Sequence, residues 1–177
     1  GLPIFYAVTL EPNERNWLFA LDMPAKVPPG AGATGDYQLL ARLPVRNRVR
    51  YETSSFLEYR AIGGATPHEL AAARQIPEDF NPRAVALAQS WRREAVTDER
   101  IVARAIEYFR RANLQYTLAP PPLGRDSVDE FLFESKSGFC EHFSSACVFR
   151  RRAAGVPARV VTGYQGGELN PIDGYLV

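Results

Sequence analysis

The N-terminal third of the chain alternates apolar and polar side chains with a period of two, the pattern typical of β-strands. In residues 48–60 one set of positions is largely apolar and the other is charged, which predicts an antiparallel strand with one solvated face. Further strands are predicted over 4–10, 17–21 and 37–43. The first two are apolar on both sides and are expected to be packed inside a core or sandwich. Residues 23–35, rich in proline and glycine, are predicted to be a loop.

After a Gly-Gly-Ala-Thr-Pro linker, apolar residues recur at helical spacing. Asn81 is predicted to cap a helix that has Pro82 at its first position. Thr97 is predicted to cap the next helix. Ser127 and Glu130, three residues apart, predict a capping box that opens a third, short helix.

These changes of pattern predict an α+β protein with a boundary near the linker. A β domain is expected over residues 1–65, sandwich- or barrel-like and incomplete at its N-terminus. A linker follows at 66–80, and residues 81–177 form a second domain of helices and the start of a sheet. The residues of the β domain do not indicate its function, for which a scaffold or a substrate-presenting role is the hypothesis.

The second domain contains a glycine turn that leads into a helix predicted over 139–154, with Gly155 as its C′ residue. A strand is predicted at 159–164, and another begins at Tyr175. Cys140 lies in the first turn of the helix, where unpaired backbone N–H groups carry about half a positive charge. A cysteine so placed tends to ionise to the nucleophilic thiolate, and the same N–H groups can hold an oxyanion. The alternative is that Cys140 is a small buried apolar residue.

The composition narrows the class of protein without choosing a function. The chain has 177 residues, 46% hydrophobic and 23% charged, with a net charge of +1, which favours neither nucleic acid nor an anionic membrane as partner. No apolar run reaches the ~18 residues of a membrane span. The chain starts without methionine and is expected to be an excised piece of a longer protein.

The two cysteines are expected to be free thiols. Cys140 and Cys147 on one helix differ by roughly 10 Å of rise, beyond the reach of a disulfide. They form no CxxC pair, and no clustered acidic or thiolate ligands indicate a metal, so no metal and no cofactor is expected.

Two segments resemble the transglutaminase-like core of the papain-like cysteine enzymes. They are residues 138–143, Gly-Phe-Cys-Glu-His-Phe, and residues 153–164, Ala-Ala-Gly-Val-Pro-Ala-Arg-Val-Val-Thr-Gly-Tyr. Residues 128–134 and 164–171 narrow the resemblance to the membrane-anchored bacterial protein-glutamine gamma-glutamyltransferases, whose core lies outside the inner membrane. The resemblance covers about residues 80–177 well and the β region more loosely.

The resemblance implies a Cys-His-Asp triad in which Cys140 is the nucleophile. The thiolate attacks a glutamine side chain, ammonia leaves, and a lysine amine or water resolves the thioester. The implied substrates are proteins with glutamine and lysine side chains, including cell-envelope proteins. The implied location is the periplasmic side of a bacterial inner membrane. Tyr164 and Gln165 are candidates to line the substrate cleft, although a structural role suits Tyr164 equally well.

The triad histidine and aspartate are expected beyond residue 177, which would leave the 177 residues inactive. His142 lies about 200° around the helix from Cys140 and is predicted to pack or hydrogen-bond rather than act as its base. His68 is expected on the surface of the linker. Arg150 and Arg151 occupy helix positions that are usually apolar in the family. They are expected to reach an edge, to reflect a rotated helix, or to mark an altered sequence.

Two other functions remain open. A peptidase or amidase would use the same thioester with water as acceptor. A non-catalytic module would keep the fold for binding, with the β domain as its interaction surface.

Overall fold

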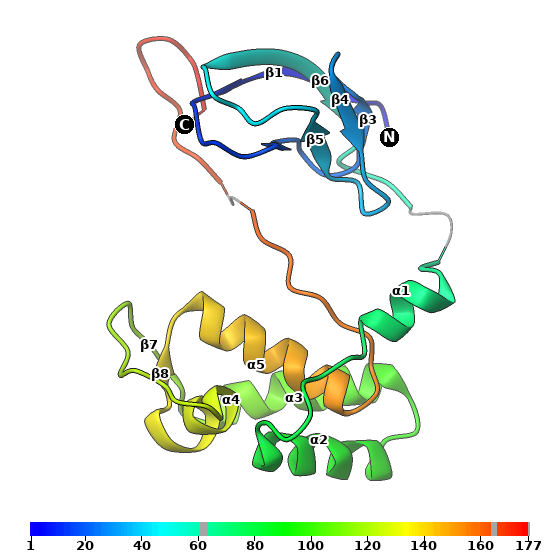
Figure 1. The fold of residues 1–177 in the computed structure, drawn as a ribbon, viewed down its shortest axis with the longest axis vertical. Coiled ribbons are helices and arrows are strands. Elements are labelled where there is room, and N and C mark those ends of the chain that lie inside the picture. Colours follow the sequence, from blue (N-terminus) through cyan, green and yellow to red (C-terminus); the bar gives the residue numbers. More distant parts are fainter. Residues whose placement is uncertain (61–63, 164–165, 177) are drawn as a thin grey trace. The chain divides into compact units, whose positions relative to one another are not determined.

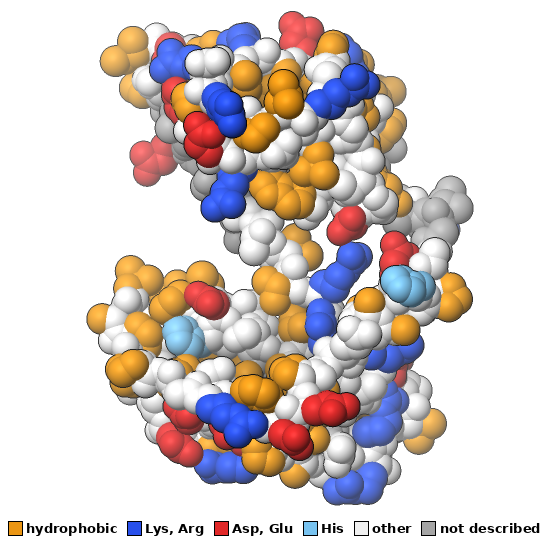
Figure 2. All heavy atoms as spheres, in the orientation of Figure 1, with side chains coloured by type: hydrophobic (Ala, Val, Ile, Leu, Met, Phe, Trp, Pro, Cys, Tyr) orange, Lys and Arg blue, Asp and Glu red, His pale blue; other side chains and the backbone are white. Residues whose placement is uncertain are grey.

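The computed structural model describes residues 1–60, 64–163 and 166–176. The chain divides into two compact units, residues 1–64 and 65–177 (Figure 1). No helix among the described residues is long and apolar enough to cross a bilayer. On the face seen in Figure 2, basic and acidic side chains alternate over both units, in keeping with the small net charge.

The first unit is all β, as predicted. It has two three-stranded antiparallel sheets with orders β1-β6-β3 and β2-β5-β4. The strands are β1 (Ile4–Leu10), β2 (Trp17–Leu18), β3 (Pro24–Lys26), β4 (Ala31–Ala33), β5 (Leu39–Ala41) and β6 (Val49–Ser55).

Four expectations for this unit were wrong. The strand predicted over 17–21 covers only Trp17–Leu18 (β2), and Trp17 is 50% exposed rather than packed inside a core. The predicted loop at 23–35 contains strands β3 and β4, because β6 and β5 offer them free edges to pair with. The strand predicted over 48–60 ends at Ser55. β1 is an edge strand that buries one face only: Leu10 is buried, whereas Phe5 on the other side is 74% exposed.

Side-chain hydroxyl groups of β6 donate hydrogen bonds to backbone carbonyls of neighbouring segments in this unit. Tyr51 donates from its hydroxyl to the Phe19 carbonyl at 2.7 Å, and Thr53 donates to the Lys26 carbonyl at 2.6 Å. Burial raises the pKa of Tyr51 to about 12. Such bonds satisfy polar groups that would otherwise be costly to bury in so small a core.

The second unit is mainly helical, and α5 packs on both α2 and α3 (Figure 1). One two-stranded parallel sheet, β7 with β8, lies beside the helices. The elements are α1 (Pro67–Ala72), α2 (Pro82–Glu94), α3 (Asp98–Arg111), β7 (Gln115–Tyr116), α4 (Ser127–Asp129), the π-helical turn η1 (Glu130–Ser135), β8 (Ser137–Gly138) and α5 (Cys140–Ala153).

The helix starts of this unit only partly follow the predicted caps. Thr97 accepts a hydrogen bond from the Arg100 N–H, as expected for the cap of α3. The capping box of Ser127 is absent, and Glu130 instead accepts from the Gly124 N–H at 2.6 Å.

Asn81 and Asp129 cap each other's helices rather than their own. The Asn81 Oδ1 accepts from the N–H groups of Val128 and Asp129, at 2.8 and 3.2 Å, at the start of α4. The Asp129 carboxylate accepts from the N–H groups of Arg83 and Ala84, at 2.8 and 2.7 Å, at the start of α2. Asn81 is the N-cap residue of α2 and Pro82 its first residue, as predicted. However, the Asn81 backbone is left-handed (φ 54°), and its side chain makes no capping bond to α2 but bonds to α4 instead.

The strands predicted after α5 do not form in the described part of the chain. Residues 157–163 belong to none of the described ladders, and a strand exists only through a hydrogen-bonded neighbour. Near Tyr175 there is one antiparallel bridge between Leu169 and Leu176 rather than a strand.

Candidate active site

Cys140 is the first residue of α5, and its side chain is exposed. The first intrahelical hydrogen bond runs from the Phe143 N–H to the Phe139 carbonyl at 3.2 Å. The N–H groups of Cys140, Glu141 and His142 therefore precede the helix ladder, at its positive end. An exposed thiol beside such groups can attack a carbonyl and have the resulting oxyanion held in place.

The turn in front of Cys140 is pinned by the small parallel sheet. The Gln115 N–H donates to the Lys136 carbonyl and the Thr117 N–H to the Gly138 carbonyl, both at 2.8 Å. The Lys136 backbone is left-handed, with φ 50°, which ends η1 and turns the chain into β8. The segment that leads to Cys140 is therefore held by backbone hydrogen bonds at Lys136, just before β8, and at Gly138, the last residue of β8.

One turn further along, Phe143 anchors the start of α5 to its neighbours. Its ring centroid lies 5.0 Å from that of Phe131 in an edge-on contact, and 6.0 and 6.2 Å from those of Phe109 and Tyr116. Aromatic pairs at these distances add to the stability gained by burial. The helix start therefore has a fixed inner side and an open outer side.

His142 is a packing and hydrogen-bonding residue, as predicted. Its Nδ1 accepts from the Phe139 N–H at 3.4 Å, and its ring meets the ring of Phe139 edge-on, with centroids 4.6 Å apart. His68 lies in α1, whose residues are not buried, and it is exposed as expected.

Arg150 is fully buried, so the expectation that its side chain reaches an edge was wrong. Its guanidinium carbon lies over three aromatic rings, 4.3 Å from the centroid of Phe109, 4.5 Å from Tyr108 and 5.0 Å from Trp91. Within the described part of the chain, neither terminal nitrogen has a hydrogen-bond partner. The ring faces replace part of the lost solvation.

Burial shifts the pKa values of Arg150 and Tyr108 within the cage that Trp91, Tyr108 and Phe109 form around Arg150. Desolvation lowers the pKa of Arg150 to about 10, while the nearby Tyr108 and Cys147 act to raise it. Burial also raises the pKa of Tyr108, and the positive charge of Arg150 acts against that rise. The cage therefore contains a cation held mainly by ring faces, on the opposite part of α5 from Cys140.

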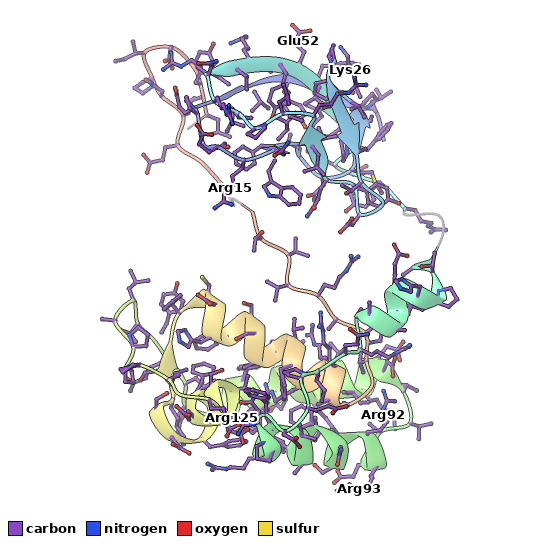
Figure 3. The ribbon with its side chains drawn as sticks, in the orientation of Figure 1. Arg15, Lys26, Glu52, Arg92, Arg93 and Arg125 are labelled. Atoms are coloured by element: carbon purple, nitrogen blue, oxygen red, sulfur yellow. The ribbon has the colours of Figure 1, made fainter. Side chains whose placement is uncertain are left out.

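The C-terminal end of α5 is closed by hydrogen bonds. Gly155, at φ 78°, is the C′ residue as predicted: its N–H donates to the Arg152 carbonyl at 2.8 Å, and the Val156 N–H donates to the Arg151 carbonyl at 2.9 Å. Arg92 of α2 donates from Nε to the Ala154 carbonyl at 2.7 Å. Figure 3 shows Arg92 at the end of α2, with the exposed Arg93 pointing away from the fold.

The remaining candidate residues are the second cysteine, Cys147, and the two expected cleft residues, Tyr164 and Gln165. Cys140 and Cys147 are both unbridged, as expected, and Cys147 is half-buried. Tyr164 and Gln165 lie outside the described residues. No group of three or more His, Cys, Asp or Glu side chains within the described ranges could hold a metal ion.

Comparison of the chain with known proteins shows the family to which it belongs. The sequence profile of the Transglutaminase-like superfamily matches residues 85–175. The chain belongs to this superfamily. The profile of the TgpA N-terminal domain matches residues 3–61, so both the predicted family and the predicted branch are confirmed.

Two curated relatives match the chain, one of them over both units. A protein-glutamine gamma-glutamyltransferase of Pseudomonas aeruginosa is 41% identical over all 177 residues, and the chain spans 26% of its length. YebA of Bacillus subtilis, an uncharacterized protein, is 56% identical over 48 residues, which are 27% of this chain and 6% of YebA.

The solved structures agree with the predicted fold class. The crystal structure of the periplasmic domain of TgpA from Pseudomonas aeruginosa superposes with a TM-score of 0.93, covering 99% of this chain and 61% of that one. The same domain bound to ethylmercury gives a TM-score of 0.92. Antiparallel β-sheets followed by a transglutaminase-like core are therefore the fold of this chain, whereas the role of Cys140 stays a prediction.

Proposed function

We propose that the chain carries the nucleophile of a cysteine-dependent acyltransferase that acts on protein glutamine side chains. The observation that supports this most is the exposed Cys140 at the first position of α5, inside the region that matches the superfamily. The activity in the name of the Pseudomonas aeruginosa relative points the same way.

In the proposed reaction the Cys140 thiolate attacks the side-chain amide carbon of glutamine. The oxyanion that forms is stabilised by N–H groups at the start of α5, and collapse of this intermediate forms a thioester as the protonated amide nitrogen leaves as ammonia. A lysine amine then attacks the thioester to form an isopeptide bond, or water attacks it to form glutamate. The thiol is regenerated in either case.

A general base must take the thiol proton and pass one to the leaving nitrogen. The Nδ1 of His142 already accepts the Phe139 N–H, and His68 lies on α1, so neither is our candidate. We propose that a histidine and an aspartate outside the 177 residues complete the site, as in the family that the sequence resembles. Tyr164 and Gln165 are proposed to contact the substrate.

The proposed substrates are proteins that present glutamine and lysine side chains, including those of the cell envelope. The matched crystal structures are of a periplasmic domain, which supports a position on the periplasmic side of a bacterial inner membrane. Since the chain spans about a quarter of its curated relative, the activity is proposed for the complete gene product.

The test compares amine transfer with hydrolysis in the complete gene product. A dansyl-amine incorporation assay on a glutamine-containing protein is run beside an ammonia-release assay, for the parent and for Cys140→Ala. We expect Cys140→Ala to lose at least about a thousandfold in both assays, because it removes the thiol that is proposed to form the thioester. Cys147→Ala serves as the matched control and should keep both activities.

Each outcome separates the candidate functions. Amine incorporation by the parent supports transfer, and ammonia release without incorporation identifies an amidase. Activity that survives in Cys140→Ala would show that the nucleophile is misassigned. A parent inactive in both assays would favour the binding module.

A further inference from the structure

His142 occupies the third position of α5, where a helix often receives a side-chain cap. In a capping box the third residue accepts a hydrogen bond from the N–H of the N-cap residue. Here the N-cap residue is Phe139, and the acceptor is the Nδ1 of His142 at 3.4 Å. An imidazole therefore fills the place that a glutamate or glutamine usually takes.

The ring of His142 is also wedged against the turn that carries Cys140. It meets the Phe139 ring edge-on and lies 5.7 Å, centroid to centroid, from the ring of Phe131. A Cβ added at Gly138 would lie 2.8 Å from both the Cβ and the Cγ of His142, too close for any side chain. Gly138 thus lets the backbone approach the imidazole closely, and the ring supports the turn from inside.

We propose that His142 is a positioning residue that closes the cap of α5 with an uncharged acceptor and so holds the turn that presents Cys140. To accept the Phe139 N–H, Nδ1 must carry no hydrogen, so the ring proton is on Nε2. The ring then supplies the cap without a charge. This inference rests on the proposed function of Cys140 for its biological meaning, although its test does not.

The absence of charge matters because the nucleophile is an anion when it reacts. A carboxylate at position 142 would close the same cap but would place a negative charge within one turn of the thiolate, which opposes ionisation. Glu141 is already in this first turn, with its side chain exposed to solvent. Position 142 faces Phe131 and Phe139 instead, where a charge would be less well solvated.

The test uses substitutions that separate the cap from the charge. His142→Gln keeps a neutral acceptor, His142→Glu keeps a charged one, and His142→Leu removes the acceptor. Two measurements are made on the full chain in a Cys147→Ala background. They are the rate constant for alkylation of Cys140 by iodoacetamide at pH 7 and the amide hydrogen exchange of the Phe139 N–H.

We expect His142→Leu to exchange the Phe139 N–H about fivefold faster and to alkylate about fivefold more slowly, the ratio that one typical hydrogen bond controls. His142→Gln should stay within about twofold of the parent in both measurements. His142→Glu should keep the slow exchange and alkylate about fivefold more slowly, because only the charge has changed. His68→Leu, at the other histidine, should change neither.

The pattern among the variants decides the proposal. It is overturned if His142→Gln is as impaired as His142→Leu, or if His142→Leu matches the parent in both measurements. Should His142→Leu fail to fold, the Gln and Glu variants still decide it, since equal alkylation rates in these two would refute the role of charge. Loss of acyl transfer in Cys140→Ala is independent of all these results, so the two proposals can fail separately.

Discussion

The two ends of α5 are built in opposite ways. At the C-terminal end the last carbonyls are bonded by the N–H groups of Gly155 and Val156 and by Arg92, and Arg150 is enclosed by three aromatic rings. At the N-terminal end the N–H groups of Cys140, Glu141 and His142 precede the first intrahelical hydrogen bond, and Cys140 is exposed.

This difference suggests a division of labour within one helix. A nucleophile must be reachable by a protein substrate, so the residues around it cannot also be buried for stability. Phe149 and Ala146 lie in the core cluster together with Phe131, and they anchor the helix from behind. We call the C-terminal half of α5, which packs in the core, the anchored half, and the turn around Cys140 the open end. Because the anchored half is packed, the open end can keep its geometry without being buried itself.

The largest effect on stability is expected in the anchored half. Phe149→Ala removes a ring that is 92% buried from the main core cluster, and should lower the free energy of unfolding by about 3–5 kcal/mol. Urea unfolding followed by circular dichroism measures the change. Leu118→Ala, at a side chain 80% exposed, is the control and should stay within about 0.5 kcal/mol. Similar losses in the two variants would contradict the inference that the burial of Phe149 anchors α5.

The second effect concerns the turn before the open end. Gly138→Ala would force the His142 ring and Phe131 apart, since the new Cβ would lie 2.8 Å from His142 Cγ and 3.0 Å from Phe131 Cε2. We expect a loss of about 1–3 kcal/mol from this overpacking, measured by urea unfolding. Gly32→Ala, where a Cβ would meet nothing within 4 Å, is the matched control. A fully tolerated Gly138→Ala would show that the turn is looser than the contacts indicate.

The third effect compares two arginines of the anchored end. Arg152 donates from Nε to the Ala158 carbonyl at 2.7 Å and from Nη1 to the Gln75 carbonyl at 3.1 Å, so Arg152→Met should cost about 1.5–3 kcal/mol. Arg150→Met should instead gain about 1–2 kcal/mol at pH 7, because it removes a buried charge whose terminal nitrogens are unpaired within the described residues.

The pH dependence of the gain gives a second check on Arg150. The pKa of Arg150 is about 10 in the folded chain, below the ordinary value of an arginine. At pH values between the two, the unfolded state binds more protons, so the parent gains stability as pH rises. The advantage of Arg150→Met should therefore be largest at neutral pH and shrink as pH rises through about 10. Unfolding of both proteins at pH 7 and pH 10.5 measures this. An advantage that grows with pH would contradict the assignment of charge burial as the cause.

The smallest effect is expected at the residue proposed to matter most for chemistry. Cys140→Ser exchanges sulfur for oxygen at an exposed position and should change the free energy of unfolding by less than about 0.5 kcal/mol. Calorimetry of the parent and variant provides the comparison. A large destabilisation would mean that Cys140 is part of the packing, as in the alternative prediction for this residue.

Several features could be predicted because their signals are local. The α5 boundaries, the Gly155 cap, the Thr97 cap and the direction of His142 follow from residue type and helical spacing within one or two turns. His142 as a cap could also have been found, since it lies three residues after Phe139 at capping-box spacing.

Other features were missed because their partners are distant in the sequence. Asn81 and Asp129 cap helices that lie far from them along the chain, and β3 and β4 form only because β6 and β5 provide edges. A propensity scale shows that Asn81 suits a helix start, but only packing decides which helix start its side chain reaches.

The sequence by itself determined the family, the order of β and helical units, and the position of Cys140 at a helix start. Only the tertiary structure decided that Arg150 is enclosed by aromatic rings from two other helices and that the His142 ring supports the cysteine turn. The physical reason is that helix starts and caps are set by neighbours within a turn, whereas the environment of a buried charge is set by which side chains packing brings around it.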